Sequence, residues 1–195
     1  YISIFEDDIL LGENAEQFLA NDEWLKMRFN FQEIFVLRLE TFLMPVQLEH
    51  QQQILPFQER NIDILKSKHF GTAGYIISNG AAKYLINLFE KLAVEDIKAI
   101  DEIMFNELIN VGVYQVYQLN PAICVQELQL NQENSLLVSD LQQERKKNTA
   151  VRTKKTLKQR LTRIKENIIR ALNKEKWKEQ QRLKEIQGKE IVRFM

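Results

Sequence analysis

Apolar residues in the first part of the chain alternate between short continuous runs and helical spacing. The run Tyr1–Phe5 is typical of a strand, and the apolar residues after Gly12 recur every three or four positions, as in a helix. Asn14 is a residue type that caps helices. Ile34–Leu39 is rich in β-branched and aromatic residues, which predicts a second strand.

The middle of the chain repeats this order of strand and helix. Gly71–Ser78 runs from a turn containing glycine into an apolar strand, and Asn79 is placed to cap the helix that follows. Asp101 opens a shorter helical pattern that closes near Gly112, and residues 113–117 again favour a strand. Alternating strands and helices predict an α/β domain.

The pattern changes in the last quarter of the chain. Apolar residues at three- and four-residue spacing predict an amphipathic helix after residue 145, at Leu157, Leu161, Ile164, Ile168 and Leu172. Residues 145–195 contain 18 basic and 5 acidic residues, a net charge of +13, which leaves −13 for residues 1–144. We therefore predict a domain at 1–130, a linker at 131–155 and a basic helical tail at 156–195.

The overall composition is that of a folded protein. The chain has 195 residues, of which 45% are hydrophobic and 28% charged, enough for one domain and an appendage. The single cysteine, Cys124, cannot form an internal disulfide and is expected to be a buried small side chain. No apolar run approaches the roughly 20 residues of a membrane span, and no signal peptide precedes the first strand. Because Tyr1 already belongs to a predicted strand, we expect the chain to be part of a longer protein.

Three acidic residues, Glu6, Asp7 and Asp8, directly follow the first predicted strand. Adjacent carboxylates at the end of a buried strand repel each other, and a hard divalent cation with oxygen ligands relieves that repulsion. Ligands of open α/β sheets also bind outside the carboxyl ends of the strands. The triplet therefore favours a cation site, and a solvated turn or helix cap is the alternative that the residues leave open.

Three segments taken in order resemble one enzyme family. They are Phe5-Glu6-Asp7-Asp8, the segment HFGTAGYIIS at residues 69–78, and Ile100-Asp101-Glu102. Together they are similar to glycosyltransferase family 25, which includes bacterial lipooligosaccharide galactosyltransferases. The resemblance covers roughly residues 1–127, and residues 121–126 resemble a late proline-containing strand of that family.

The resemblance implies a nucleotide-sugar domain of the GT-A type, in which an acidic motif holds Mn²⁺ or another divalent cation against the diphosphate of a UDP-sugar. The metal role falls here to Asp7 and Asp8, with Asp8 the first choice as direct ligand, and Glu6 would contact the ribose or support the ligands. The cation would act as a Lewis acid that neutralises charge on the departing UDP. His69 is a further candidate ligand, with a hydrogen-bonded structural histidine as the alternative.

Transfer with inversion, which the resemblance suggests, needs a carboxylate that takes the proton of the acceptor hydroxyl. Asp101 is the candidate base and Glu102 the second candidate, although a helix N-cap would also explain Asp101. Gly71 and Thr72 would bring backbone and a hydroxyl close to a sugar or phosphate, unless the glycine only serves a tight turn. Tyr75 is a candidate for the substrate pocket, and the alternative is a core aromatic residue on a strand.

The resemblance further implies a donor, an acceptor and a location. The enzyme would move a hexose, with galactose favoured, from a UDP-sugar to a lipooligosaccharide or lipopolysaccharide acceptor. The basic tail fits an anionic membrane surface, with about 1 kcal/mol of attraction per Lys or Arg, so we expect a cytoplasmic enzyme held at the inner face of the membrane. The acidic domain itself and plain solvent are alternatives for the tail, and nucleic acid is not expected because no recognised module is present.

Part of the expected domain is missing, and a second function class stays open. A GT-A domain builds much of its donor pocket from strands before the acidic motif, and two such βα units need roughly 60 residues. We therefore expect a partial domain, lacking its N-terminal strands, that is weakly active or inactive alone. The rival hypothesis is a non-catalytic scaffold for a membrane or partner, in which the acidic loop is a cap.

Overall fold

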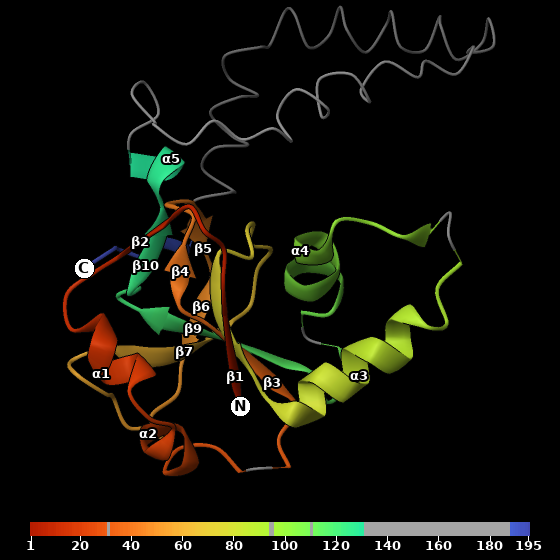
Figure 1. Ribbon diagram of the computed structural model, residues 1–195, viewed down its shortest axis with the longest axis horizontal. Helices are drawn as coiled ribbons and strands as arrows, with labels where there is room; N and C mark the ends of the chain where they lie inside the picture. Colours follow the sequence, from red (N-terminus) through yellow and green to blue (C-terminus); the bar gives the residue numbers. More distant parts are fainter. Residues whose placement is uncertain (31, 94–95, 110, 131–187) are drawn as a thin grey trace, which may run out of the picture. The chain divides into compact units, whose positions relative to one another are not determined.

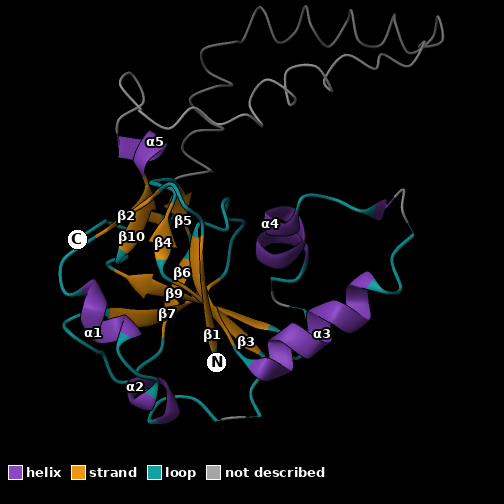
Figure 2. Cartoon of the chain, viewed as in Figure 1, coloured by secondary structure: helices purple, strands orange, loops and turns teal. Residues whose placement is uncertain are grey.

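A computed structural model describes residues 1–30, 32–93, 96–109, 111–130 and 188–195 (Figures 1 and 2). The strands are β1 (Ile2–Phe5), β2 (Ile9–Leu11), β3 (Phe35–Arg38), β4 (Glu40–Thr41), β5 (Pro45–Val46), β6 (Leu48–His50), β7 (Asn61–Leu65), β8 (Gly74–Ile77), β9 (Gln115–Asn120), β10 (Cys124–Gln126) and β11 (Glu190–Ile191). The helices are α1 (Ala15–Leu19), α2 (Glu23–Lys26), α3 (Asn79–Phe89), α4 (Ile100–Glu102), the π-helix η2 (Ile103–Glu107) and α5 (Glu127–Leu130).

The described residues form a six-stranded sheet in the order β1-β8-β3-β9-β7-β6. Strand β3 pairs in parallel with β9, and the other neighbours in this sheet are antiparallel. Every residue of β3 and β8 is buried, because both faces of these central strands are covered, and their sequences are accordingly almost continuous apolar runs. The prediction of a mixed α/β domain is confirmed at this level, and the GT-A assignment stays a prediction.

Apolar side chains fill both faces of the large sheet. On one face, α3 and η2 pack against side chains of β3, β8 and β9. On the other face, α1 and α2 bury Phe18, Trp24 and Leu25 against the same strands. Within the described part of the chain, no helix combines the length and the hydrophobicity that crossing a bilayer requires.

Several predicted elements are confirmed, but the predicted helix caps are not. Ser78, rather than Asn79, caps α3, because its Oγ accepts hydrogen bonds from the backbone N–H groups of Ala81 and Phe35, at 3.1 and 3.0 Å. This hydroxyl therefore joins the start of α3 to the neighbouring strand β3. Asn14 does stand at the N-cap position of α1, but in the left-handed conformation and without a side-chain cap bond.

The last eight residues correct the predicted helical tail. After a turn at Gly188, β11 pairs with β5, and Phe194 forms a β-bridge with Ala122. Val192 is fully buried, and its carbonyl accepts a hydrogen bond from the hydroxyl of Thr41 at 2.7 Å. Ala122 bonds the backbone of Arg193 and Met195. The end of the chain therefore joins the domain through backbone pairing and the buried side chain of Val192. The predicted linker and the rest of the predicted helix, residues 131–187, lie outside the described residues.

Candidate active site

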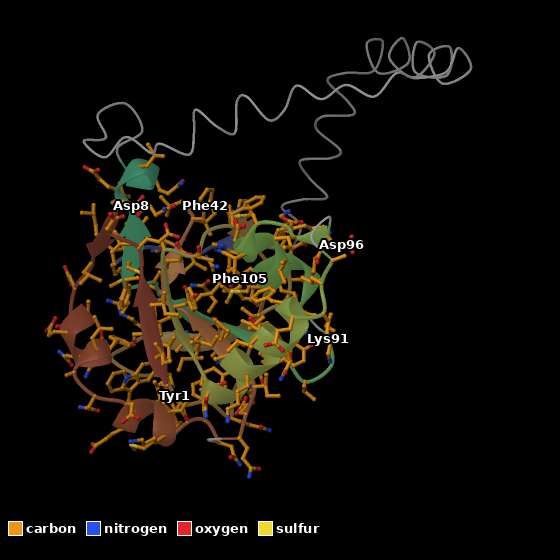
Figure 3. All side chains as sticks on the ribbon, turned by 45° about the vertical axis from the view of Figure 1, so that its right-hand side comes forward. Tyr1, Asp8, Phe42, Lys91, Asp96 and Phe105 are labelled. Atoms are coloured by element: carbon orange, nitrogen blue, oxygen red, sulfur yellow. The ribbon has the colours of Figure 1, made fainter. Side chains whose placement is uncertain are left out.

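The acidic triplet directly follows β1, at the end of the strand away from Tyr1. Figure 3 shows Tyr1 before β1 and Asp8 at the far end of its path. The backbone is fixed on both sides of the triplet, since the Glu6 N–H donates to the Ala73 carbonyl and the Asp8 carbonyl accepts from the Glu127 N–H, each at 2.9 Å. The position of these carboxylates is therefore set by β8 and by the start of α5.

Gln126, at the end of β10, brings two of the three carboxylates together. Its side-chain amide donates to Oε2 of Glu6 at 3.0 Å and to Oδ2 of Asp8 at 3.1 Å. The other carboxylate oxygen of Glu6 accepts the Thr72 hydroxyl at 2.8 Å. Asp7 is exposed beside this group. Glu6 and Asp8 thus face one point, and the Gln126 amide lies between their like charges.

The segment at Gly71 and Thr72 also reaches the predicted base. The Gly71 N–H donates to Oδ2 of Asp101 at 3.3 Å, and the other oxygen of that carboxylate accepts from the Glu102 N–H at 2.9 Å. Gly71 has φ +82°, a conformation that L side chains rarely adopt, and a Cβ there would lie 3.1 Å from both carboxylate oxygens of Glu40. Glycine is therefore required at this turn both by its backbone conformation and by the space available.

Glu102 is held differently from its neighbour Asp101. One of its oxygens is paired with the Lys68 ammonium and the other accepts from the Asn106 amide. These two hydrogen bonds lower the pKa of Glu102 below its ordinary value. Both oxygens of Glu102 are engaged by side chains, whereas Oδ2 of Asp101 has only the long contact from the Gly71 N–H, so the geometry favours Asp101 over Glu102 for proton abstraction.

His69 and Tyr75 belong to the interior. The His69 ring bonds the Phe70 carbonyl through Nδ1, and burial together with the nearby Arg38 guanidinium holds its pKa well below the ordinary value. Tyr75 lies in the core beside Phe105, and burial raises its pKa. Both environments match the structural alternatives given above. A search of the described residues finds no group of three His, Cys, Asp or Glu side chains able to hold a metal ion, so His69 is not brought together with Asp7 and Asp8.

Three residues of this region were not recognised in the sequence: Gln126, Arg38 and Glu40. Arg38 and Glu40 are 0% and 1% exposed and form an ion pair of 2.8 Å directly beneath the Gly71 turn. Burial raises the pKa of Glu40 to about 7, although Arg38 opposes that shift. One sequence signal could have revealed Arg38 and Glu40. They are two positions apart next to an apolar strand, so the alternation of a strand places both side chains on the same face.

The donor set at Gln126 suits a hard cation that is also held by a substrate. Two carboxylates converge there, and small divalent ions such as Mg²⁺ are often bound by one or two carboxylates together with substrate phosphates. The side-chain amide of Gln126 has both an NH₂ group, which can donate to the carboxylates, and a carbonyl oxygen, which can face a cation. The arrangement can therefore hold a cation that a diphosphate completes.

Comparison with known proteins points to one enzyme family. The family model for "Glycosyltransferase family 25 (LPS biosynthesis protein)" matches residues 1–104. The lipooligosaccharide biosynthesis protein lex-1 of Haemophilus influenzae is 66% identical over all 195 residues. The lacto-N-neotetraose biosynthesis glycosyltransferases LgtE and LgtB of Neisseria gonorrhoeae are 39% and 40% identical, and their alignments also cover the whole chain.

These relatives are longer than the present chain. The chain spans 65% of the length of lex-1 and 70% of the length of LgtE and of LgtB. The match of the family model includes the acidic triplet, the Gly71 turn and Asp101, and ends at Met104. All of the predicted site residues therefore lie within the matched segment, whereas Gln126 lies beyond it.

Proposed function

The chain belongs to glycosyltransferase family 25, and from that premise we propose that it transfers a hexose from a UDP-sugar to a lipooligosaccharide acceptor with the help of a divalent cation. The single observation that carries the proposal is the convergence of the Glu6 and Asp8 carboxylates at one point, joined through Thr72 to the turn that contacts Asp101. Carboxylates for a cation and a carboxylate for proton transfer are thus linked by a single backbone segment.

Asp8 and Glu6, whose carboxylates converge beside the Gln126 amide, would hold Mn²⁺ or a similar cation, and Asp7, the second ligand that the family resemblance implies, is exposed next to them. When bound, such a cation would neutralise the negative charge that develops on the departing UDP. The protein's own contribution is to keep the carboxylates in place before the cation arrives. Thr72 fixes one Glu6 oxygen at 2.8 Å, and Gln126 fixes the other at 3.0 Å.

Asp101 would take the proton from the acceptor hydroxyl. The long contact of 3.3 Å from the Gly71 N–H leaves Oδ2 of Asp101 weakly held, whereas both oxygens of Glu102 are engaged. A base acting opposite the leaving group gives inversion at the transferred carbon. We propose galactose as the transferred sugar because of the family resemblance.

The acceptor and the location follow from the relatives' names and the charge of the tail. Lex-1 is named for lipooligosaccharide biosynthesis, and LgtE and LgtB for lacto-N-neotetraose biosynthesis. An acceptor carried on a lipid would be met at the inner face of the cytoplasmic membrane. Attachment there through the 18 basic residues of positions 145–195 is a proposal from the sequence, tested by sedimentation with vesicles that contain or lack anionic lipid.

Calorimetric titration of UDP into the purified chain, with and without Mn²⁺, tests the donor and metal site. We expect binding that requires Mn²⁺ and that weakens at least about tenfold in Asp8→Ala, because one of two converging carboxylates is lost. Asp96→Ala is the matched control, since it removes an exposed carboxylate from the connection between α3 and α4. Binding that ignores Mn²⁺, or that both variants reduce equally, would contradict the proposal.

A further inference from the structure

Arg38 is buried beneath the turn that links the two halves of the candidate site. Its Nη1 donates to the Gly71 carbonyl, and its Nη2 donates to the Phe70 carbonyl and to Oε1 of Glu40, all at 2.8 Å. The guanidinium carbon also lies 4.1 Å from the centre of the Phe105 ring. One side chain at the end of β3 therefore contacts two successive peptide groups of the turn.

Such an arrangement is costly, and it does not stabilise the fold merely by being an ion pair. Taking a guanidinium and a carboxylate out of water carries a large desolvation penalty, and well-packed apolar residues often replace such pairs without loss of stability. Arg38 Nε is, moreover, buried without a hydrogen-bond partner among the described residues. The feature that apolar residues could not reproduce is the planar fork of donors that faces the two carbonyls.

The segment that Arg38 holds makes contacts on both of its sides. The Gly71 N–H donates to Oδ2 of Asp101, on the side of the predicted base. One residue later, the Thr72 hydroxyl donates to Oε1 of Glu6, on the side of the acidic triplet. A rotation of the Gly71 peptide would move both donors at once, so the separation of the two carboxylates depends on the orientation of this short piece of backbone.

We propose that Arg38 is a positioning residue for glycosyl transfer: by binding the Phe70 and Gly71 carbonyls it sets the turn that holds Glu6 and Asp101 at their working separation. The inference rests on the proposed function for the roles of those two carboxylates. It assigns to Arg38 no contact with the substrate. Its effect on the site passes through the backbone of residues 70–72.

Arg38→Lys tests the inference, with Arg28→Lys as its matched control. Arg28 also donates to two successive carbonyls, those of Leu55 and Pro56, and lies 5.1 Å from the centre of a Phe57 ring, but its loop carries no predicted site residue. Lysine keeps the charge in both variants and loses the planar fork. Any general effect of this substitution on folding should therefore appear in both.

The first measurement is amide hydrogen exchange, read residue by residue under conditions in which each variant is folded. In Arg38→Lys we expect exchange at Gly71 to rise at least about tenfold, while Ser78, at the start of α3, stays unchanged. Arg28→Lys should leave Gly71 unchanged. Equal Gly71 exchange in the wild-type chain and Arg38→Lys overturns the inference.

The second measurement is the Mn²⁺-dependent affinity for UDP. Arg38→Lys should weaken it at least about fivefold, because the Thr72 hydroxyl no longer fixes Glu6, and Arg28→Lys should leave it within about twofold. Faster exchange at Gly71 with unchanged affinity overturns the positioning role. If the wild-type chain binds no UDP, the comparison is repeated in a chain extended to the length of its relatives. Absence of UDP binding there contradicts the proposed function, whereas the exchange comparison by itself supports or overturns the role of Arg38 in holding the turn.

A milder variant covers the case in which Arg38→Lys does not fold. Phe105→Leu removes the aromatic ring beneath the guanidinium and leaves the three hydrogen bonds of Arg38 available. We expect exchange at Gly71 to rise about two- to fivefold, since the cation–π contact that helps to hold the guanidinium is lost while its hydrogen bonds remain. No change at Gly71 in a folded Phe105→Leu chain counts against the inference.

Discussion

Glu40→Gln should change how the stability of the domain depends on pH. Glu40 is 1% exposed, and burial raises the pKa of its carboxyl from 4.5 to about 7, with Arg38 acting in the opposite direction. The folded state therefore binds this proton more tightly than the unfolded chain does. Glutamine has nearly the shape of the protonated side chain and can still accept the hydrogen bond from Arg38, but it does not titrate.

The sign and the size follow from proton linkage. Below the unfolded pKa of 4.5, both states hold the proton and the fold has its full stability from this group. As the pH rises toward about 7, the unfolded chain has released the proton while the folded state still retains it, so the free energy of unfolding falls. Each pKa unit corresponds to about 1.4 kcal/mol, which gives a loss of about 3 kcal/mol for Glu40.

Urea unfolding of both proteins between about pH 4 and pH 8 measures this loss as a difference. His69 also titrates abnormally, because its pKa lies well below the ordinary value, and it adds stability as the pH rises toward 6.5. That contribution is present in both proteins and largely cancels when wild-type stability is subtracted from that of Glu40→Gln. The difference should therefore shift by about 3 kcal/mol in favour of the variant across the range.

Parallel pH profiles would refute the reasoning, because they would mean that Glu40 has the same pKa in the folded and unfolded states. A shift in the opposite direction would be more informative. It would mean that the attraction of Arg38 exceeds the desolvation of the carboxylate, so that the ion pair stabilises the charged form. Either result would remove Glu40 as a buried group that titrates near neutral pH.

Two further predictions concern packing and catalysis. Gly74→Ala should lower the free energy of unfolding by about 1 to 3 kcal/mol, because its Cβ would lie 2.3 Å from the Cys124 sulfur. In urea unfolding, Cys124→Ala in the same chain should restore part of that loss, and simple additivity of the two substitutions would refute this. In a chain extended to the length of its relatives, Asp101→Asn should reduce kcat by about 10² to 10⁴-fold, and Glu102→Gln by much less, in an assay of UDP release. The reverse order would assign the base to Glu102.

Much of the sheet was predictable because its central strands are buried on both faces. The segments at β1, β3 and β8 are short apolar runs next to turns, and α3 has a regular helical spacing. Ser78 and Asn79 are both residue types that cap helices, and the choice between them was made by a tertiary contact, the hydrogen bond from the Phe35 N–H to the Ser78 hydroxyl.

The acidic end of β1 was also predictable, whereas its surroundings were not. Gln126 contacts Asp8 because β10 pairs with β2 and places Gln126 opposite Ile9, a register that no local pattern reveals. Arg38 and Glu40 follow the alternation of a strand, but their burial depends on a turn about thirty residues further along the chain. Sequence patterns therefore located the carboxylates, and only tertiary structure located the groups that hold them.

Because residues 188–195 form part of the domain, the basic segment cannot be removed by truncation without damage. A chain that stops at residue 130 would also lose β11 and the buried side chain of Val192, and it would leave the hydroxyl of Thr41 without its acceptor. Replacing residues 131–187 with a flexible linker would preserve these contacts, since the entropy of closing a loop varies only slowly with its length. Such an internally deleted chain would separate the chemistry of the domain from any role of the basic segment in attachment to membranes.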